Sequence, residues 1–343
     1  MIRNDILLKA CRQEPTEHTP IWIMRQAGRY LPEYREIRKE KSLMEIFNDP
    51  DLASEIVCMP VERFGFDAAI LFADIMLPLK SIGMDFEIRD EVGPVIKDPV
   101  RSPQSVEKLS CHEVRGDVPF VFELIRKAKR RLDVPLIGFS GAPFTLASYL
   151  IEGKASKDFV ATKAFMRRYP QAWHTLMRKL TELTVSYLAE QISEGVDVIQ
   201  LFDSWVGILG RDEYDEFVLR YSQMILGSVK KKGIPSIHFG TNTSHLLESM
   251  KEAGGDVIGI DWRINIDEAW KRLGNNIGIQ GNLDPKALLS SQSLKAMSLD
   301  VLKKANRIGH IFNLGHGILP NTPVENVAEL VNVVHSYKRQ YDG

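Results

Sequence analysis

The stretch that decides the fold lies near the N-terminus, at residues 20–35, and reads PIWIMRQAGRYLPEYR. Its first part, residues 21–24, is a short apolar run that predicts a buried strand. Gly28 predicts a tight turn after this strand, and Pro32 is placed where a helix begins. A buried strand, a tight turn and a helix in this order are one unit of an alternating β/α fold.

Two arginines, Arg25 and Arg29, follow the predicted strand directly. A guanidinium at the mouth of a buried strand is costly unless an anion meets it there. The pair therefore predicts either an anion-binding clamp or a structural ion pair with Glu33 or a later carboxylate, and the stretch alone favours neither.

Eight short runs rich in β-forming residues recur along the chain, and amphipathic helical patterns separate them. Most of the runs are continuously apolar, which is typical of parallel strands covered on both faces. Eight β/α units without a glycine-rich nucleotide turn predict one (β/α)8 TIM barrel, an α/β fold, spanning a single domain at 1–343; the alternative is a doubly wound open sheet. The predicted strands are 21–24, 68–72, 136–139, 196–202, 236–239, 257–260, 277–280 and 310–314.

One insertion interrupts this alternation, near 85–100. Residues 85–89 and 95–97 each favour a strand, and Gly93-Pro94 between them favours a turn. We therefore expect a small β-hairpin outside the barrel.

Composition limits the possible partners. The 343 residues carry 44 basic and 45 acidic side chains, so no basic excess is left to neutralise nucleic-acid phosphates. No window predicts a membrane span and the N-terminus does not resemble a signal peptide, so we expect a cytoplasmic protein without a membrane partner. The three cysteines, Cys11, Cys58 and Cys111, are far apart, which predicts neither a disulfide framework nor a structural zinc site.

Polar side chains follow the predicted strands where a barrel carries its chemistry, beyond the carboxyl ends of the strands. Because this ring has two arginines and few carboxylates, it predicts an anionic ligand. Its members include Arg25, Arg29, Asp74, Tyr149, Asp203, Ser204, Asp261 and His316.

Asp74 is a lone carboxylate in the apolar context FADIM. Burial raises the pKa of such a group unless a cation or a donor holds it charged. A site that stabilises positive charge on a nitrogen heterocycle needs a carboxylate of this kind. The alternative is an aspartate that caps the following turn.

The other candidates each have a structural alternative. Tyr149 falls in a predicted helix, where a tyrosine is more often part of the core. Ser204 lacks a nucleophile elbow, so donating a hydrogen bond to a ligand is its best functional role. His316 lies between two glycines that allow the backbone to approach a ligand closely, which favours a site.

Known metal and cofactor motifs are missing from the sequence. It has no HExxH, no GxGxxG and no GxxxxGK[ST], and its cysteines lie away from the predicted strand ends. We therefore expect no metal ligands at the site and no cofactor, with the chemistry supplied by side chains and by the substrate itself.

Four segments resemble the uroporphyrinogen decarboxylase family. Residues 24–35, MRQAGRYLPEYR, match its signature, and residues 138–145, GFSGAPFT, match its second motif. The segments FDSW at 202–205 and NLGHGI at 313–318 match its later barrel-end segments. The resemblance extends over essentially the whole chain.

The resemblance implies a (β/α)8 barrel that forms a homodimer and uses no metal or prosthetic group. It implies a small-molecule substrate, uroporphyrinogen III, whose four acetate side chains become methyl groups with loss of carbon dioxide. The product, coproporphyrinogen III, serves haem and porphyrin biosynthesis. Asp74 corresponds to the family's central aspartate, which accepts hydrogen bonds from pyrrole N–H groups and stabilises a protonated pyrrole ring.

The resemblance also assigns the remaining site residues. Arg25 is the expected proton-transfer residue, although an arginine is a weak acid, and Tyr149 and His316 are its competitors. Two alternative functions remain. One is a corrinoid-linked methyltransferase of the same barrel superfamily, which needs zinc held by His and Cys, and the other is a non-catalytic tetrapyrrole-binding protein. The substrate-binding residues implied are Arg25, Gln26, Ala27, Gly28, Arg29, Arg38, Asp74, Tyr149, Phe202, Ser204 and His316.

Overall fold

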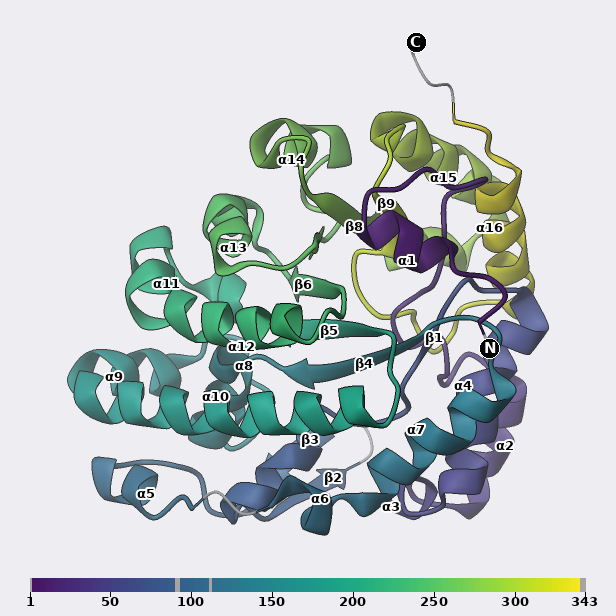
Figure 1. Cartoon of the computed structure of the whole chain (residues 1–343). Helices are drawn as coiled ribbons and strands as arrows, with labels where there is room; N and C mark the ends of the chain where they lie inside the picture. Colours follow the sequence, from purple (N-terminus) through teal and green to yellow (C-terminus); the bar gives the residue numbers. More distant parts are fainter. Residues whose placement is uncertain (1, 90–92, 111–112, 340–343) are drawn as a thin grey trace.

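Seven parallel strands form the central sheet of the computed structural model, which describes residues 2–89, 93–110 and 113–339 (Figure 1). Their spatial order follows their order in the chain, without the reversal that defines a doubly wound sheet. This order confirms a barrel-like α/β fold. The strands are β1 (Ala69–Ile70), β4 (Leu136–Gly141), β5 (Val198–Asp203), β6 (Ser236–Gly240), β7 (Val257–Gly259), β8 (Gly278–Leu283) and β9 (His310–Leu314).

The predicted first strand, at 21–24, occupies the place between β9 and β1. Ile21 forms a parallel bridge with Phe312, whose N–H donates to the Pro20 carbonyl oxygen at 2.8 Å. On the other side, the Asp67 N–H donates to the Ile21 carbonyl oxygen at 2.9 Å. The segment thus joins the two edges of the sheet, although its pairing is limited to a bridge and single hydrogen bonds.

Helices cover the outside of this sheet, as Figure 1 shows. Two of the amphipathic segments between the strands do not form a single helix: residues 211–231 form two helices that meet at Val218, and residues 285–305 begin with a 3₁₀ turn. The helices that precede the third barrel strand are α1 (Ile6–Cys11), α2 (Pro32–Glu40), α3 (Leu43–Phe47), α4 (Pro50–Phe64), α5 (Pro103–Glu107), α6 (Val114–Asp117) and α7 (Pro119–Arg131).

The remaining helices alternate with the later strands. They are α8 (Pro143–Glu152), α9 (Val160–Arg168), α10 (Pro170–Ser193), α11 (Arg211–Phe217), α12 (Leu219–Lys231), α13 (Leu247–Ala253), α14 (Ile266–Leu273), α15 (Ser291–Ala305) and α16 (Val324–Ser336). Short 3₁₀ turns are η1 (Leu77–Ile82), η2 (Val206–Ile208), η3 (Ser244–Leu246) and η4 (Pro285–Leu289).

The predicted hairpin is present as a separate two-stranded sheet. Strands β2 (Phe86–Arg89) and β3 (Gly93–Ile96) pair in antiparallel register. The expected turn at Gly93-Pro94 was misplaced, because both residues already belong to β3. The connection lies at 90–92, outside the described residues, as does Cys111 of the three cysteines.

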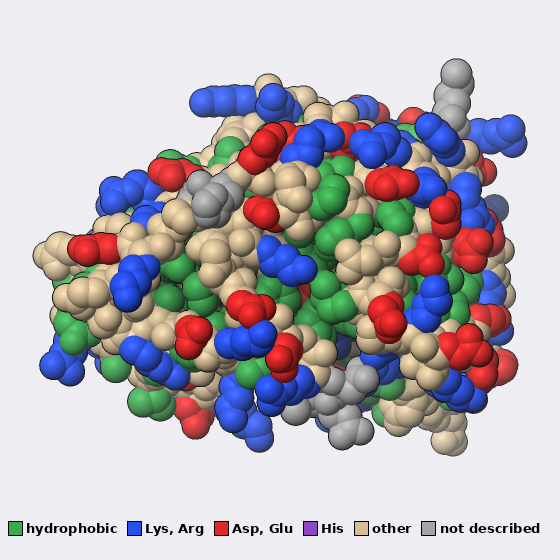
Figure 2. All heavy atoms as spheres, turned by 90° about the horizontal axis from the view of Figure 1, so that it is seen from below, with side chains coloured by type: hydrophobic (Ala, Val, Ile, Leu, Met, Phe, Trp, Pro, Cys, Tyr) green, Lys and Arg blue, Asp and Glu red, His purple; other side chains and the backbone are tan. Residues whose placement is uncertain are grey.

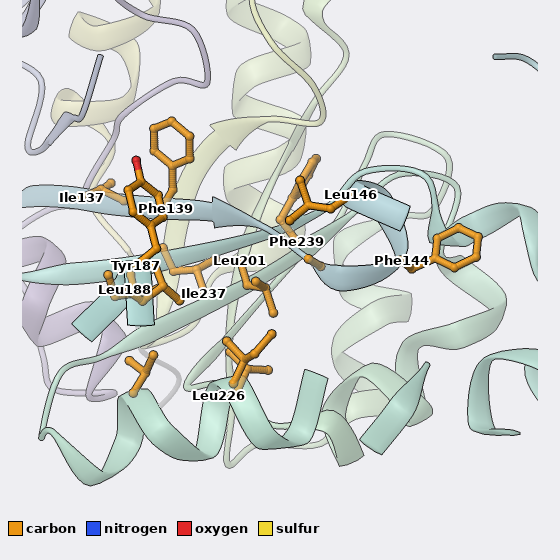
Figure 3. Close-up of a cluster of buried hydrophobic side chains, with 14 of the residues drawn as sticks. Ile137, Phe139, Phe144, Leu146, Tyr187, Leu188, Leu201, Leu226, Ile237 and Phe239 are labelled. Carbon is orange, nitrogen blue, oxygen red and sulfur yellow. The ribbon is translucent and has the colours of Figure 1, made fainter. Parts of the chain in front are cut away.

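The core fills the space between the strands and the helices. Figure 3 shows buried apolar side chains of β4, β5 and β6, such as Phe139, Leu201 and Ile237, beside Leu188 of α10. On the surface, Figure 2 shows Lys and Arg side chains interspersed with Asp and Glu, in keeping with the balanced charge. Within the described ranges, no helix is long and apolar enough to cross a membrane.

Candidate active site

A pocket of about 330 Å³ opens at the carboxyl ends of the strands. It brings together residues that are far apart in the sequence but that each follow a strand end, as the barrel prediction requires. The residues predicted for the site that line this pocket are Arg25, Ala27, Asp74, Tyr149, Phe202, Ser204 and His316.

Arg25 is held at the pocket by an unusual backbone. Its φ is 64°, in the left-handed region that side chains other than glycine rarely adopt. A Cβ on Gly28 would lie 2.6 Å from the Arg25 carbonyl oxygen, and a Cβ on Gly317 would lie 2.5 Å from Arg25 Cδ. Both glycines are therefore needed where they stand, and a strained conformation in such a setting is typical of a functional residue.

Asn313 ties the Arg25 segment to the loop that carries His316. Its side-chain Oδ1 accepts hydrogen bonds from the N–H groups of Met24, at 3.1 Å, and Leu314, at 2.8 Å. The Ile318 N–H then donates to the Met24 carbonyl oxygen at 3.0 Å. These bonds explain why the first and the last segments of the barrel meet at one side of the pocket.

Asp74 follows β1 and is partly buried in the pocket wall. Burial raises the pKa of its carboxyl group, while the Met76 N–H, which donates to Asp74 Oδ1 at 2.8 Å, and the charge of Arg25 act in the opposite direction. The carboxylate therefore caps the following turn and also lines the pocket, so the capping role leaves it available to a ligand.

Tyr149 is positioned by a contact network between α8 and the end of β5. Thr145, one helical turn before it, donates to Asp203 Oδ1 at 3.1 Å. The Tyr149 ring packs on the Trp205 ring with 4.0 Å between centroids. Burial and the nearby Asp74 carboxylate raise the pKa of the Tyr149 phenol, against the charge of Arg25. The hydroxyl thus stays protonated and can donate a hydrogen bond into the pocket.

His316 is exposed and lines the pocket. Desolvation lowers its pKa, as do the charges of Arg25 and Arg263, while Asp261 opposes this shift. Because the pKa of a free imidazole is already near 6.5, the ring is neutral at physiological pH. It can accept a proton from a reacting molecule.

Arg263, which the sequence analysis did not single out, is outside the pocket lining, but its charge acts on His316. Its guanidinium pairs with the buried Asp261 carboxylate and lies over the Trp262 ring, 4.3 Å from the ring centroid. Its position two residues after Asp261, one of the polar residues at the predicted strand ends, could have identified Arg263 from the sequence.

Aromatic rings form much of the pocket wall. The Phe202 ring packs edge-on against Phe139, with centroids 5.5 Å apart, and against Phe239, at 5.9 Å. Phe72 packs between Tyr34, at 5.7 Å, and Phe47, at 5.4 Å. Only Phe202 was predicted; the available signal was that β4, β5 and β6 each carry one Phe near the carboxyl end of the strand. Such walls suit a flat, largely apolar ligand with charged edges.

Four predicted substrate-binding residues, Gln26, Gly28, Arg29 and Arg38, are outside the pocket lining. The buried side chain of Gln26 donates to the Ala68 carbonyl oxygen at 2.9 Å, so it holds the loop. Arg38, on α2, donates to the Lys41 carbonyl oxygen at 2.7 Å. Arg29 is exposed on the loop before α2.

Glu33, the first carboxylate considered as a partner of the two arginines, contacts a neighbouring helix. Glu33 pairs with Arg63 of α4, which anchors α2 to that helix. The carboxylate near Arg25 is Asp74, whose charge Arg25 stabilises. Asp74 is thus a later carboxylate of the kind that the ion-pair alternative requires, and the clamp interpretation stays a prediction.

Side chains that could bind a metal ion lie together outside the pocket. Among the described residues, one group of three possible ligands was found, His18, Asp67 and His335. Asp67 precedes β1, so this group lies at the amino ends of the strands, opposite the pocket.

Comparison with known proteins decides the family. The model of the family described as uroporphyrinogen decarboxylase matches residues 2–337. The chain belongs to the uroporphyrinogen decarboxylase family. It is 50% identical over 336 residues to the uroporphyrinogen decarboxylase of Carboxydothermus hydrogenoformans, covering 97% of this chain and 96% of the relative. It is 48% identical over 340 residues to that of Sorangium cellulosum, covering 98% and 97%.

A solved structure supports the fold of this uroporphyrinogen decarboxylase family member. A methyltransferase from Methanosarcina mazei superposes with a TM-score of 0.80 and covers 95% of this chain and 96% of its own. At 20% identity, this likeness concerns the shared barrel architecture alone.

Proposed function

We propose that this chain decarboxylates the four acetate side chains of uroporphyrinogen III to methyl groups, giving coproporphyrinogen III for haem and porphyrin biosynthesis. The observation that carries the proposal is the placement of a half-buried carboxylate, Asp74, beside the Arg25 guanidinium in an aromatic pocket. Membership of the uroporphyrinogen decarboxylase family supports the choice of substrate.

The carboxylates of the substrate are matched by the arginines of the site. A charge-assisted hydrogen bond to a carboxylate contributes ~1.5–3 kcal/mol when it is desolvated. We assign this role to Arg25 inside the pocket and to Arg29 and Arg38 outside it, with backbone contacts around Ala27 and Gly28. The hydroxyls of Tyr149 and Ser204 and the His316 ring orient the substrate, and Phe202 forms one wall.

Asp74 stabilises the charge that the reaction creates. Protonation of a pyrrole carbon gives a cationic ring, and the bond from the acetate methylene to its carboxylate then breaks. Carbon dioxide leaves, and the bonding electron pair moves into the ring, which acts as the electron sink. The methylene carbon then takes up a proton and the ring carbon loses one, so each round consumes one proton. A carboxylate at hydrogen-bonding distance of the pyrrole N–H groups lowers the energy of this cation.

Arg25 is our proposed proton-transfer residue, and Tyr149 and His316 are the competing candidates. The raised pKa of Tyr149 suits a donor of hydrogen bonds, and the lowered pKa of His316 suits a base. The pH dependence of kcat distinguishes these candidates. If His316→Gln, and no other variant, lost the decrease of kcat at low pH, the proton-transfer role would belong to His316.

The protein is further proposed to act as a cytoplasmic homodimer that needs no metal or prosthetic group for the reaction. The resemblance to the family supports this arrangement. The catalytic steps above use only side chains of this chain and the substrate's own ring.

The experiment that tests the function follows the loss of carboxylates. Uroporphyrinogen III is incubated anaerobically with the purified protein, and the oxidised products are separated by chromatography according to their number of carboxylates. We expect successive loss of four carboxylates to coproporphyrinogen. Binding of the substrate without any product would instead indicate a tetrapyrrole-binding protein, and methyl transfer from a methylated corrinoid on addition of zinc would indicate a methyltransferase.

A further inference from the structure

His18, Asp67 and His335 come together at the end of the barrel that faces away from the pocket. His18 lies in the segment between α1 and the first barrel segment, Asp67 lies directly before β1, and His335 lies in the last turn of α16. Figure 1 shows these parts of the chain, the N-terminal segment and α16, on the same side of the molecule. None of the three residues has a part in the proposed decarboxylation.

The two imidazoles converge on the two oxygens of one carboxylate. His18 Nε2 lies 3.3 Å from Asp67 Oδ1, and His335 Nε2 lies 2.9 Å from Asp67 Oδ2. The ring centroids are 4.4 Å apart, and the three ligand atoms all lie within 4.8 Å of one another. Nitrogen and oxygen atoms about 3.3 Å apart can share a tetrahedral metal ion, so only small shifts are needed to bind one.

The carboxylate is held in place by other groups. Asp67 Oδ1 accepts a hydrogen bond from the Asn4 side-chain amide at 2.8 Å, and Oδ2 accepts one from the Ile21 N–H at 2.8 Å. The Asp67 side chain is only 2% exposed, whereas those of His18 and His335 are 24% and 29% exposed. The carboxylate is thus fixed in position, while both imidazole rings remain accessible to solvent.

We infer that His18, Asp67 and His335 form a binding site for a divalent transition-metal ion of the Zn²⁺ class. Each histidine would bind the ion through the lone pair of Nε2, and the proton that this nitrogen now directs at Asp67 would be carried on Nδ1 of the neutral ring, exchanged through solvent. The oxygen lone pairs released in this way would turn to the ion, while the bonds to Asn4 and Ile21 keep the carboxylate oriented, as supporting contacts do in metal sites. Since both rings are partly exposed, water can complete the coordination.

The positive charge of Arg339, which lies close to His18, opposes binding of a metal ion. The Arg339 guanidinium donates to Thr16 Oγ1 at 2.7 Å and to the His18 carbonyl oxygen at 3.1 Å. Its charge weakens binding of a divalent cation, so we expect a site of moderate affinity.

A bound ion would connect three segments that are far apart in the chain: the N-terminal segment, the start of β1 and the C-terminal helix. A ligand that binds only the folded state stabilises it, and the stabilisation grows with ligand concentration. The inference is independent of the proposed function, because the site and the pocket lie at opposite ends of the strands.

Thermal unfolding of the full chain with and without excess Zn²⁺ tests this site, together with equilibrium dialysis that counts bound ions. We expect one ion per chain and a rise in Tm of about 3 °C or more. The variants are His18→Gln and His335→Gln, because a glutamine amide still donates to Asp67 but is a poor metal ligand. His174→Gln is the matched control, since His174 lies in α10 and bonds to Tyr221, away from the cluster.

The expected result is that both cluster variants lose the bound ion and the Zn²⁺-dependent rise in Tm, while their Tm without metal and the behaviour of the control stay near those of the wild type. Substitution of Co²⁺ should give the visible absorption bands of a tetrahedral site in the wild type and not in the cluster variants. Absence of binding by the wild-type chain, or equal binding by the cluster variants and the wild type, would overturn the inference.

Discussion

The carboxyl group of Asp203 is buried at the end of β5, where Thr145 Oγ1 donates to its Oδ1 at 3.1 Å. Burial raises its pKa to about 7, and the bond from Thr145 only partly opposes the shift. Between the pKa in the unfolded chain and about 7, the folded state therefore holds a proton that the unfolded state has lost. This proton makes its full contribution to the free energy of unfolding below the pKa that Asp203 has in the unfolded chain. The contribution is lost as the pH rises toward about 7.

Replacing Asp203 with asparagine removes this proton dependence. We expect the wild type to lose roughly 4 kcal/mol of unfolding free energy relative to Asp203→Asn as the pH rises from about 4 to about 8, because a pKa shift of one unit corresponds to ~1.4 kcal/mol. Urea unfolding at a series of pH values measures the difference. Parallel stability curves for the two proteins would show that Asp203 is ionised in the fold.

Arg29 belongs to the proposed group of carboxylate-binding arginines although it lies outside the pocket lining. We expect Arg29→Ala to raise KM roughly tenfold, since one charge-assisted hydrogen bond is lost, with little change in kcat or Tm. Arg35→Ala, on the exposed side of α2, is the matched control. Equal KM values for the two variants would remove Arg29 from the binding site.

At the scale of the elements, Asn313 joins the first and last barrel segments through the hydrogen bond that its Oδ1 accepts from the Met24 N–H. Truncation to alanine leaves the buried Met24 N–H without its partner, which costs about 1–3 kcal/mol. We expect Asn313→Ala to lower Tm and to reduce kcat, because Arg25 follows Met24 directly. The exposed Asn332→Ala is the control, measured by thermal unfolding and by the decarboxylation assay. Wild-type kcat in Asn313→Ala would mean that this connection does not position Arg25.

Strands and their ends were largely predictable from sequence, because buried parallel strands form continuous apolar runs and a barrel places their ends together. That reasoning located Arg25, Asp74, Tyr149, Ser204 and His316 at one pocket. The sequence could not show that residues 20–24 join β9 to β1. This connection depends on hydrogen bonds from Phe312 and Asp67 rather than on a local sequence pattern.

Other features depend on contacts that a sequence does not show. The break at Val218 between α11 and α12 occurs within one amphipathic pattern. Gln26 looked like part of the substrate loop, yet its amide is used to fix that loop to Ala68. Arg263 reaches the surroundings of His316 only because Asp261 and Trp262 hold its guanidinium. Tertiary packing decided each of these cases.

At the scale of the whole molecule, the proposed homodimer is testable in solution. Multi-angle light scattering coupled to size-exclusion chromatography should give about twice the chain mass of 38.9 kDa at micromolar concentration. A mass equal to that of one chain over the whole concentration range would show that the proposed dimer does not form.

The central claim is that the Asp74 carboxylate drives decarboxylation by stabilising a protonated pyrrole ring. The most direct measurement is the rate of carbon dioxide loss from uroporphyrinogen, under anaerobic conditions and with substrate bound in excess enzyme, by the wild type and by Asp74→Asn. We predict that Asp74→Asn folds and binds the substrate but forms product roughly 10²–10³-fold more slowly. Product formation by Asp74→Asn at the wild-type rate would contradict the claim.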